Sequence, residues 1–243
     1  MAALLEVTGL RKRFGAIVVA DDVTFTLEPG HCLGVIGPNG AGKSSVFNLI
    51  AGTIPADGGA ICFEGRELSR VPAHLRARRG IVRAFQIPQP FPHLTVYENV
   101  LAAASFGAGR SGTAAGAAAL EVLSTMGLTA KAGTPAGRLP LLDRKRLELA
   151  KAVASAAKVL LLDEIAAGLT EPEVEELVAL VGSLKTSHAI IWIEHIPHAL
   201  RAVADRIMVL HFGKNVLEGP PAEVMTSRLV REIYMGFRAD DVA

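Results

Sequence analysis

The chain has 243 residues, half of them hydrophobic, which is enough to form one large domain or a core with a subdomain. A formal net charge of +1 gives no overall electrostatic attraction to nucleic acid or to an anionic membrane. Cys32 and Cys62 lie far apart in apolar surroundings without metal-binding spacing, so we expect small buried core residues in a reducing compartment. No secretory signal and no run of about 18 apolar residues occurs, so we expect a chain that does not itself cross a membrane.

The first predicted elements are two strands, at residues 4–8 and 23–27, in which apolar and polar residues alternate. The loop between them contains Phe14 among charged residues. An aromatic side chain in such a loop fits two interpretations equally well. It can be a core residue under the loop, or it can be a platform on which a nucleobase stacks.

Residues 37–45 match the phosphate-binding pattern G-x-x-x-x-G-K-[ST], between a predicted buried strand at 32–36 and a predicted helix that continues through 46–50. The glycines allow successive backbone N–H groups to point into one concavity, and the helix adds its positive N-terminal end. We expect Lys43 to reach the β- and γ-phosphates and Ser44 to ligate Mg²⁺. The alternative is a glycine-rich turn with a surface lysine. The predicted phosphate loop comprises Gly37, Pro38, Asn39, Gly40, Ala41, Gly42, Lys43, Ser44 and Ser45.

A basic stretch, residues 66–83, follows a short predicted strand at 60–63. It indicates a solvated helix face, with a docking surface for an acidic partner as the alternative. A strand at 81–85 then ends at Gln86, and polar residues at the carboxyl end of parallel strands lie where ligands bind. The Gln86 amide can ligate Mg²⁺ or donate to a water, although its spacing alone favours an ordinary turn glutamine.

Residues 87–157 carry no strand pattern and predict a helical insertion in an α/β core. Thr95, with a glutamate three residues later, predicts a capping box at the start of a helix. Residues 105–116 are rich in Gly, Ala and Ser and predict a mobile loop, followed by a helix at 117–126. A helix at 143–156 has an apolar stripe and a charged face that we expect to be solvated: Arg144, Lys145, Arg146, Glu148 and Lys151.

Four apolar residues at 159–162 run into Asp163 and Glu164, which predicts a buried strand that ends at the ligand edge of a sheet. Asp163 suits a Mg²⁺ site opposite Ser44, and Glu164 can polarise an attacking water. The alternative is a strand followed by an acidic helix cap. His195 follows another buried strand, at 189–193, where a lone histidine is more often a capping or core residue.

The order of these features resembles the nucleotide-binding subunit of an ABC transporter over essentially the whole chain. Segments 83–86, 91–100, 166–169 and 193–195 are similar to the subunits of branched-chain amino-acid importers. The resemblance implies an α/β fold, in which a P-loop (RecA-like) core carries an antiparallel β subdomain and an inserted α-helical subdomain. The implied division is a single ABC ATPase domain whose core and β subdomain span 1–86 and 158–243, with a helical subdomain at 87–157.

The resemblance also implies roles for these residues: Phe14 stacks on adenine, Gln86 senses Mg²⁺ and the water, Glu164 is the general base, and His195 steadies the γ-phosphate. It implies hydrolysis of ATP with Mg²⁺ by a dimer at the cytoplasmic face of the cell membrane. Two permease subunits and, indirectly, a solute-binding protein would be partners in the uptake of branched-chain amino acids or a related small organic solute. The alternative is a soluble ABC ATPase that couples ATP to work on DNA or the ribosome, which the near-neutral charge disfavours.

Three positions depart from the family pattern. The signature loop, usually Leu-Ser-Gly-Gly-Gln, stands here as Leu-Pro-Leu-Leu-Asp at residues 139–143. Pro140 lacks the hydroxyl and N–H of serine, and each leucine would cost about 1–2 kcal/mol if a left-handed backbone were needed. Asp143 is expected to place a negative charge near another negative charge. Ile165 replaces a proline, and Thr170 a longer polar residue. An intact phosphate loop beside a degenerate signature loop favours a heterodimer over a homodimer.

Overall fold

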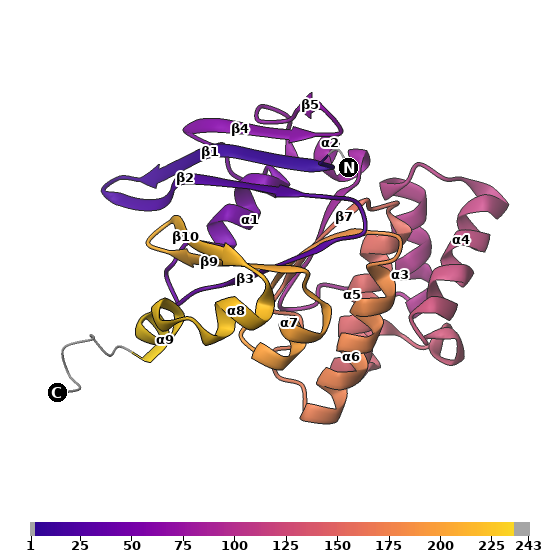
Figure 1. Cartoon of the computed structure of the whole chain (residues 1–243). Helices are drawn as coiled ribbons and strands as arrows, with labels where there is room; N and C mark the ends of the chain where they lie inside the picture. The colour runs from indigo at the N-terminus through magenta and orange to yellow at the C-terminus, as the bar shows by residue number, and fades with distance from the viewer. Residues whose placement is uncertain (1–2, 236–243) are drawn as a thin grey trace. The chain divides into compact units, whose positions relative to one another are not determined.

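The computed structural model describes residues 3–235 (Figure 1). The chain forms two compact units, the first from Met1–Pro72 and Ala189–Ala243 and the second from Ala73–His188. The division predicted at residues 87 and 158 stays a prediction. Within residues 3–235, the structure contains no helix whose length and apolar content would suffice to cross a lipid bilayer.

The first unit contains a four-stranded antiparallel sheet with the strand order β2-β1-β4-β5. Its strands are β1 (Leu5–Phe14), β2 (Ile17–Leu27), β4 (Gly58–Phe63) and β5 (Arg66–Glu67). Apolar residues alternate with exposed ones along β1 and β2, as a sheet with one buried face requires. The prediction that Phe14 lies in a loop is wrong, because β1 continues to this residue. Cys62 is only half-buried, so its prediction as a core residue is wrong too, whereas Cys32 is buried.

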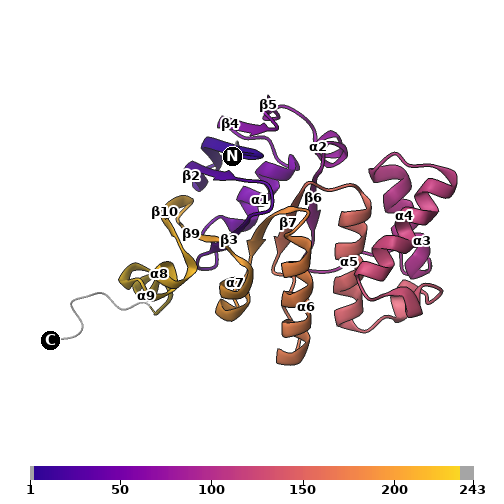
Figure 2. The same ribbon diagram turned by 45° about the vertical axis from the view of Figure 1, so that its right-hand side comes forward.

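The same unit contains β3 (Cys32–Ile36), which pairs in parallel with β8 (Ala189–Ile193) on one side and β9 (Arg206–His211) on the other. Strand β10 (Lys214–Gly219) pairs with β9 in the antiparallel sense. Every residue of β3 and β8 is buried, which explains their unbroken apolar sequences. The helices of this unit are α1 (Lys43–Ala51), α7 (Pro197–Val203), α8 (Pro221–Thr226) and α9 (Arg228–Met235). Helix α1 lies between the antiparallel sheet and the β9-β3 strands in both ribbon views (Figures 1 and 2).

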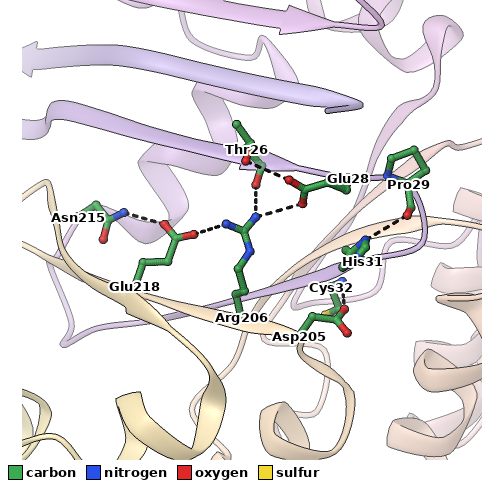
Figure 3. Close-up of polar contacts among 9 residues, drawn as sticks. All are labelled: Thr26, Glu28, Pro29, His31, Cys32, Asp205, Arg206, Asn215 and Glu218. Carbon is green, nitrogen blue, oxygen red and sulfur yellow. Dashed lines mark hydrogen bonds and ion pairs between the residues drawn. The ribbon is translucent and has the colours of Figure 1, made fainter. Parts of the chain in front are cut away.

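One arginine joins β9 to the end of β2, as Figure 3 shows. The guanidinium of Arg206 donates to the backbone oxygen of Thr26 (2.7 Å) and pairs with Glu28 (3.2 Å) and Glu218 (2.7 Å). Arginine presents several donors in a planar fork, so it can hold three partners at once. This contact joins β9 and β10 to the end of β2.

The second unit contains a parallel strand pair, β6 (Ile81–Ala84) and β7 (Val159–Asp163). Its helices are α2 (Ala73–Arg79), α3 (Val96–Ala102), α4 (Gly112–Thr125), α5 (Leu141–Ala154) and α6 (Glu171–Leu184), with short helical turns at Ala103–Gly107, Thr129–Lys131 and Ala136–Arg138. Helices α3, α4 and α5 lie side by side (Figures 1 and 2). Thr95 and Glu98 form the predicted capping box at the start of α3.

Two further predictions for this unit are wrong. Residues 105–116 are not a mobile loop throughout, because a π-helical turn occupies Ala103–Gly107 and α4 already begins at Gly112. The basic stretch around α2 is not uniformly solvated, since Arg76 is only 2% exposed. Burial lowers the pKa of this guanidinium from its ordinary value.

Candidate functional site

The phosphate-loop pattern forms the turn between β3 and α1, in the predicted strand–loop–helix context. Gly37 and Gly42 adopt left-handed φ angles of 156° and 102°. A Cβ on Gly37 would lie 2.1 Å from the backbone oxygen of Leu210, and one on Gly42 would lie 2.2 Å from that of Val19. Both positions therefore require glycine, because no side chain could occupy that space.

Lys43, the first residue of α1, is held over the loop. Its ammonium donates to the backbone oxygens of Gly37 (2.7 Å) and Pro38 (3.0 Å), and the side chain is largely buried. An ammonium among backbone carbonyls, at the N-terminus of a helix whose first turn has no acidic residue, offers positive charge to an anion. Within the same loop Ser44, Asn39 and Gly40 are exposed, and Ala41 is buried.

Phe14 stands at the end of β1 in the same unit, and half of its surface is exposed. The ammonium of Lys12 lies 5.2 Å from the centre of its ring and 2.7 Å from a carboxylate oxygen of Asp57. The hydrogen bond from Lys12, and then that from the backbone N–H of Arg13, lower the pKa of Asp57. Because the Phe14 ring is exposed, it is not a core residue, and stacking on a nucleobase remains the prediction for it.

His195 follows β8 and is exposed, whereas Glu194 before it is 2% exposed. The backbone N–H of His195 donates to the Glu194 carboxylate at 2.9 Å. This contact fixes the backbone of His195 and leaves its ring on the surface of the first unit. Its predicted contact with a γ-phosphate stays a prediction.

In the second unit, β7 delivers Asp163 as its last residue, and the next residue is Glu164. Asp163 is buried and accepts a hydrogen bond from Arg83 of the neighbouring strand β6. Glu164 has a left-handed φ of 45°, which costs a non-glycine residue about 1–2 kcal/mol. Such strain at a strand end is common where a side chain must be aimed at a ligand.

Gln86 and Glu164 are brought together by the structure. The side-chain amide of Gln86 donates to the Glu164 carboxylate at 2.7 Å. The side chain of Gln86 thus reaches a predicted catalytic group, and its predicted roles toward Mg²⁺ and the water stay predictions. A hydrogen bond to a charged carboxylate orients it more strongly than a bond between neutral groups would.

The degenerate signature loop has no left-handed residue, because none of residues 139–143 has a positive φ. Pro140 precedes the first turn of α5, and Leu142 is buried, so the leucines cause no backbone strain. Asp143 is 4% exposed and pairs with Lys131 and, at 3.8 Å, with Arg146. Cations of the same unit therefore pair with this carboxylate, and its expected approach to another negative charge stays a prediction.

The predicted metal ligands offer oxygen atoms only: the Ser44 hydroxyl, the Gln86 carbonyl and the Asp163 carboxylate. Such a donor set suits Mg²⁺, which keeps several waters and shares its coordination with substrate phosphates. Within residues 3–235 no group of three or more His, Cys, Asp or Glu side chains could form a metal cage by itself. The chemistry of these donors is that of a magnesium ligand set, and a shared magnesium site stays a prediction.

Sequence reasoning missed Arg83 and Lys145. Arg83 pairs with Asp163, which lies 80 positions later, and Lys145 donates to the backbone oxygen of Gln86, 59 positions earlier. The pairing of β6 with β7 could have indicated Arg83, because parallel neighbours place residues 81–84 beside 159–162. Lys145 had no such signal, since its helix pattern predicts an exposed face.

Comparisons with known proteins agree with this architecture. The family model described as ABC transporter matches residues 20–167. The high-affinity branched-chain amino acid transport ATP-binding proteins BraF of Pseudomonas aeruginosa and LivG of Escherichia coli K12 are each 34% identical, covering 96% of this chain and 98% of the relative. The lipopolysaccharide export system ATP-binding protein LptB of Escherichia coli K12 is 30% identical with the same coverage.

A solved ATP-binding cassette of an ABC transporter in its ADP conformation superposes with a TM-score of 0.88 at 27% identity, covering 98% of this chain and 100% of that one. A nucleotide-free cassette gives a TM-score of 0.87 at 27% identity, covering 97% of this chain and 100% of that chain. These matches confirm the predicted α/β fold of an ABC ATPase. The chain belongs to the ABC transporter family, as an ATPase subunit that binds and hydrolyses ATP.

Proposed function

We propose that the chain powers the uptake of a small solute, a branched-chain amino acid or a related organic molecule, through partner permeases at the cytoplasmic face of the cell membrane. The observation that carries this proposal is the 34% identity to two branched-chain amino acid transport proteins, extending over 96% of the chain. One relative, at 30% identity, serves lipopolysaccharide export. The test must therefore distinguish uptake from export.

In the proposed reaction, the phosphate loop binds the triphosphate through its backbone N–H groups and the ammonium of Lys43. Phe14 stacks on the adenine, and the exposed ring of His195 steadies the γ-phosphate. Glu164, oriented by Gln86, accepts a proton from the water that attacks the γ-phosphorus as the bond to the leaving oxygen breaks. Ser44, Gln86 and Asp163 would hold Mg²⁺, which when bound neutralises charge on the phosphates.

Docking to a permease is proposed for the segment that follows Gln86. Two apolar side chains in this segment are strongly exposed, Ile87 (73%) and Phe91 (57%), and so is Phe106 (79%) in the turn Ala103–Gly107. All three belong to the second unit, two of them within six residues of Gln86. These side chains offer apolar contacts to a permease, which supports the second unit as the docking region.

A heterodimer with a second ABC ATPase subunit is proposed from the state of the signature loop. Pro140 removes a hydroxyl and an N–H, and the Asp143 carboxylate is already engaged by cations of its own unit. Glu164 and the phosphate loop keep their family residues. A partner with an ordinary signature loop would therefore complete the site on this chain's nucleotide, while the opposite site would hydrolyse slowly.

The test is reconstitution of the chain with its copurified partners in proteoliposomes, with labelled leucine supplied on the side facing the binding protein. ATP-dependent accumulation of leucine supports the proposal. ATP hydrolysis that responds to DNA or ribosomes and not to permeases would overturn it, as would ATP-driven removal of lipid from the vesicle membrane. For the heterodimer, Glu164→Gln should remove most turnover. A larger loss from the equivalent change in the partner would contradict the asymmetry.

A further inference from the structure

Three charged side chains of α5 hold the backbone of segment 86–89. Lys145 donates to the backbone oxygen of Gln86, and Lys151 donates to that of Gln89 at 2.8 Å. Glu148 accepts from the backbone N–H of Gln89 at 3.1 Å and pairs with Lys151 at 3.0 Å. We call these three side chains the α5 clamp. It grips both ends of a four-residue segment that begins with the residue in contact with Glu164.

The spacing of the clamp explains why one helix can do this. Its members stand at positions i, i+3 and i+6, which lie along one face of an α-helix. This is the face that the sequence predicts to be solvated, yet Lys145 is 3% exposed and Glu148 is 5% exposed. Burying such charges is costly unless they are paired, and here their contacts with segment 86–89 and with each other offset that cost.

The clamp leads directly to the proposed general base. Lys145 contacts the backbone of Gln86, and the side chain of Gln86 donates to Glu164. These contacts form a continuous path from α5 to the Glu164 carboxylate within the second unit. Ile87, inside the gripped segment, still exposes 73% of its surface. The clamp therefore fixes the backbone and leaves Ile87 available to a partner.

We propose that Lys145, Glu148 and Lys151 are positioning residues for ATP hydrolysis, which hold Gln86 so that its amide keeps Glu164 in the orientation that accepts a proton. This inference rests on the proposed role of Glu164 in hydrolysis.

The test is steady-state ATP hydrolysis by the full chain assembled with its partner subunits, in wild type, Lys145→Met and Lys145→Arg. Lys145→Met is expected to lower kcat about tenfold, the effect of losing one hydrogen bond to an orienting group, with the KM for ATP changed less than about twofold. Lys145→Arg keeps a donor and should recover most of the rate. Thermal unfolding of each variant checks that it is folded.

A double-mutant cycle separates positioning from simple stabilisation. If Lys145 acts through Gln86, then Lys145→Met should add no further loss in a Gln86→Ala background, within about twofold. Equal losses in both backgrounds, or an unchanged kcat, would overturn the inference. If Lys145→Met does not fold, Glu148→Gln takes its place, with exposed Glu175→Gln on α6 as the matched control. Absence of hydrolysis by the wild type would instead refute the proposed function, and the inference with it.

Discussion

The side-chain amide nitrogen of Gln86 lies 2.7 Å from a carboxylate oxygen of Glu164. The two residues follow neighbouring parallel strands, β6 and β7, so the strand pairing places them at the same edge. Glu164 adopts a left-handed φ of 45°, a strained backbone conformation of the kind that occurs at functional sites. The Gln86 amide therefore restrains the orientation of the Glu164 carboxylate.

Replacing Gln86 with alanine removes the donor without adding a charge. We expect kcat for ATP hydrolysis to fall about 10- to 100-fold, as for the loss of a hydrogen bond to a charged group, with little change in the KM for ATP. Gln89→Ala is the matched control, because the α5 clamp contacts only the backbone of Gln89. This substitution should lower kcat far less. Equal effects of the two substitutions would contradict the role assigned to the Gln86 side chain.

Gly42→Ala should abolish nucleotide binding. The added Cβ would stand 2.2 Å from the backbone oxygen of Val19, so the phosphate loop would have to move. Gly65→Ala is the matched control, because Gly65 also has a left-handed φ, of 71°, but has no atom within 4 Å of the added Cβ. Binding of a fluorescent ATP analogue to Gly65→Ala should match the wild type. Retained binding by Gly42→Ala would show that the loop tolerates displacement.

Asp143→Asn should destabilise the second unit, because it removes the buried negative charge that pairs with Lys131 and Arg146. We expect a loss of about 1–2 kcal/mol in the free energy of unfolding, below the usual cost of breaking a buried pair, since Lys131 is 45% exposed and can turn to water. Asp22→Asn disrupts an exposed pair with Arg11 and should cost almost nothing. Urea unfolding of both variants checks the difference. Equal free energies of unfolding for the two variants would mean that the Asp143 carboxylate does not stabilise the fold.

The capping box at α3 predicts a pH dependence of stability. Hydrogen bonds from the backbone N–H and then the hydroxyl of Thr95 lower the pKa of Glu98 below its ordinary value of 4.5. Because the pKa of Glu98 is lower in the folded state, the ionised carboxylate stabilises the fold. This stability is fully present above the unfolded-state pKa and is lost as the pH falls through the folded-state pKa. Glu98→Gln should therefore be less stable than the wild type at pH 7, and the difference should shrink in acid. A difference that is constant with pH would contradict this assignment; exposed Glu121→Gln is the control.

Much of the fold is predictable from local patterns. Strands β3 and β8 are unbroken apolar runs, and the structure gives them the predicted bounds because parallel strands buried on both faces tolerate few polar residues. The Thr95 capping box is equally local, since it needs only two residues three positions apart. The start of α4 was missed, because its Ala- and Gly-rich sequence carries little periodicity.

The parts of the site that the sequence did not reveal depend on distant contacts. Lys145 and Glu148 belong to a helix face that is polar by pattern, yet they are buried and contact segment 86–89. Arg83 meets Asp163 only through the pairing of two strands separated by a long helical region. No helical or strand periodicity encodes such partners, so they follow from tertiary structure alone.

The central claim is that Glu164 accepts the proton of the attacking water in a chain that hydrolyses ATP. The direct measurement is phosphate release from ATP by the wild type and by Glu164→Gln, with nucleotide binding followed in parallel. We predict that Glu164→Gln binds ATP like the wild type and releases phosphate about 10²- to 10⁴-fold more slowly, the usual contribution of a general base. Phosphate release at the wild-type rate by Glu164→Gln, with binding intact, would contradict the account.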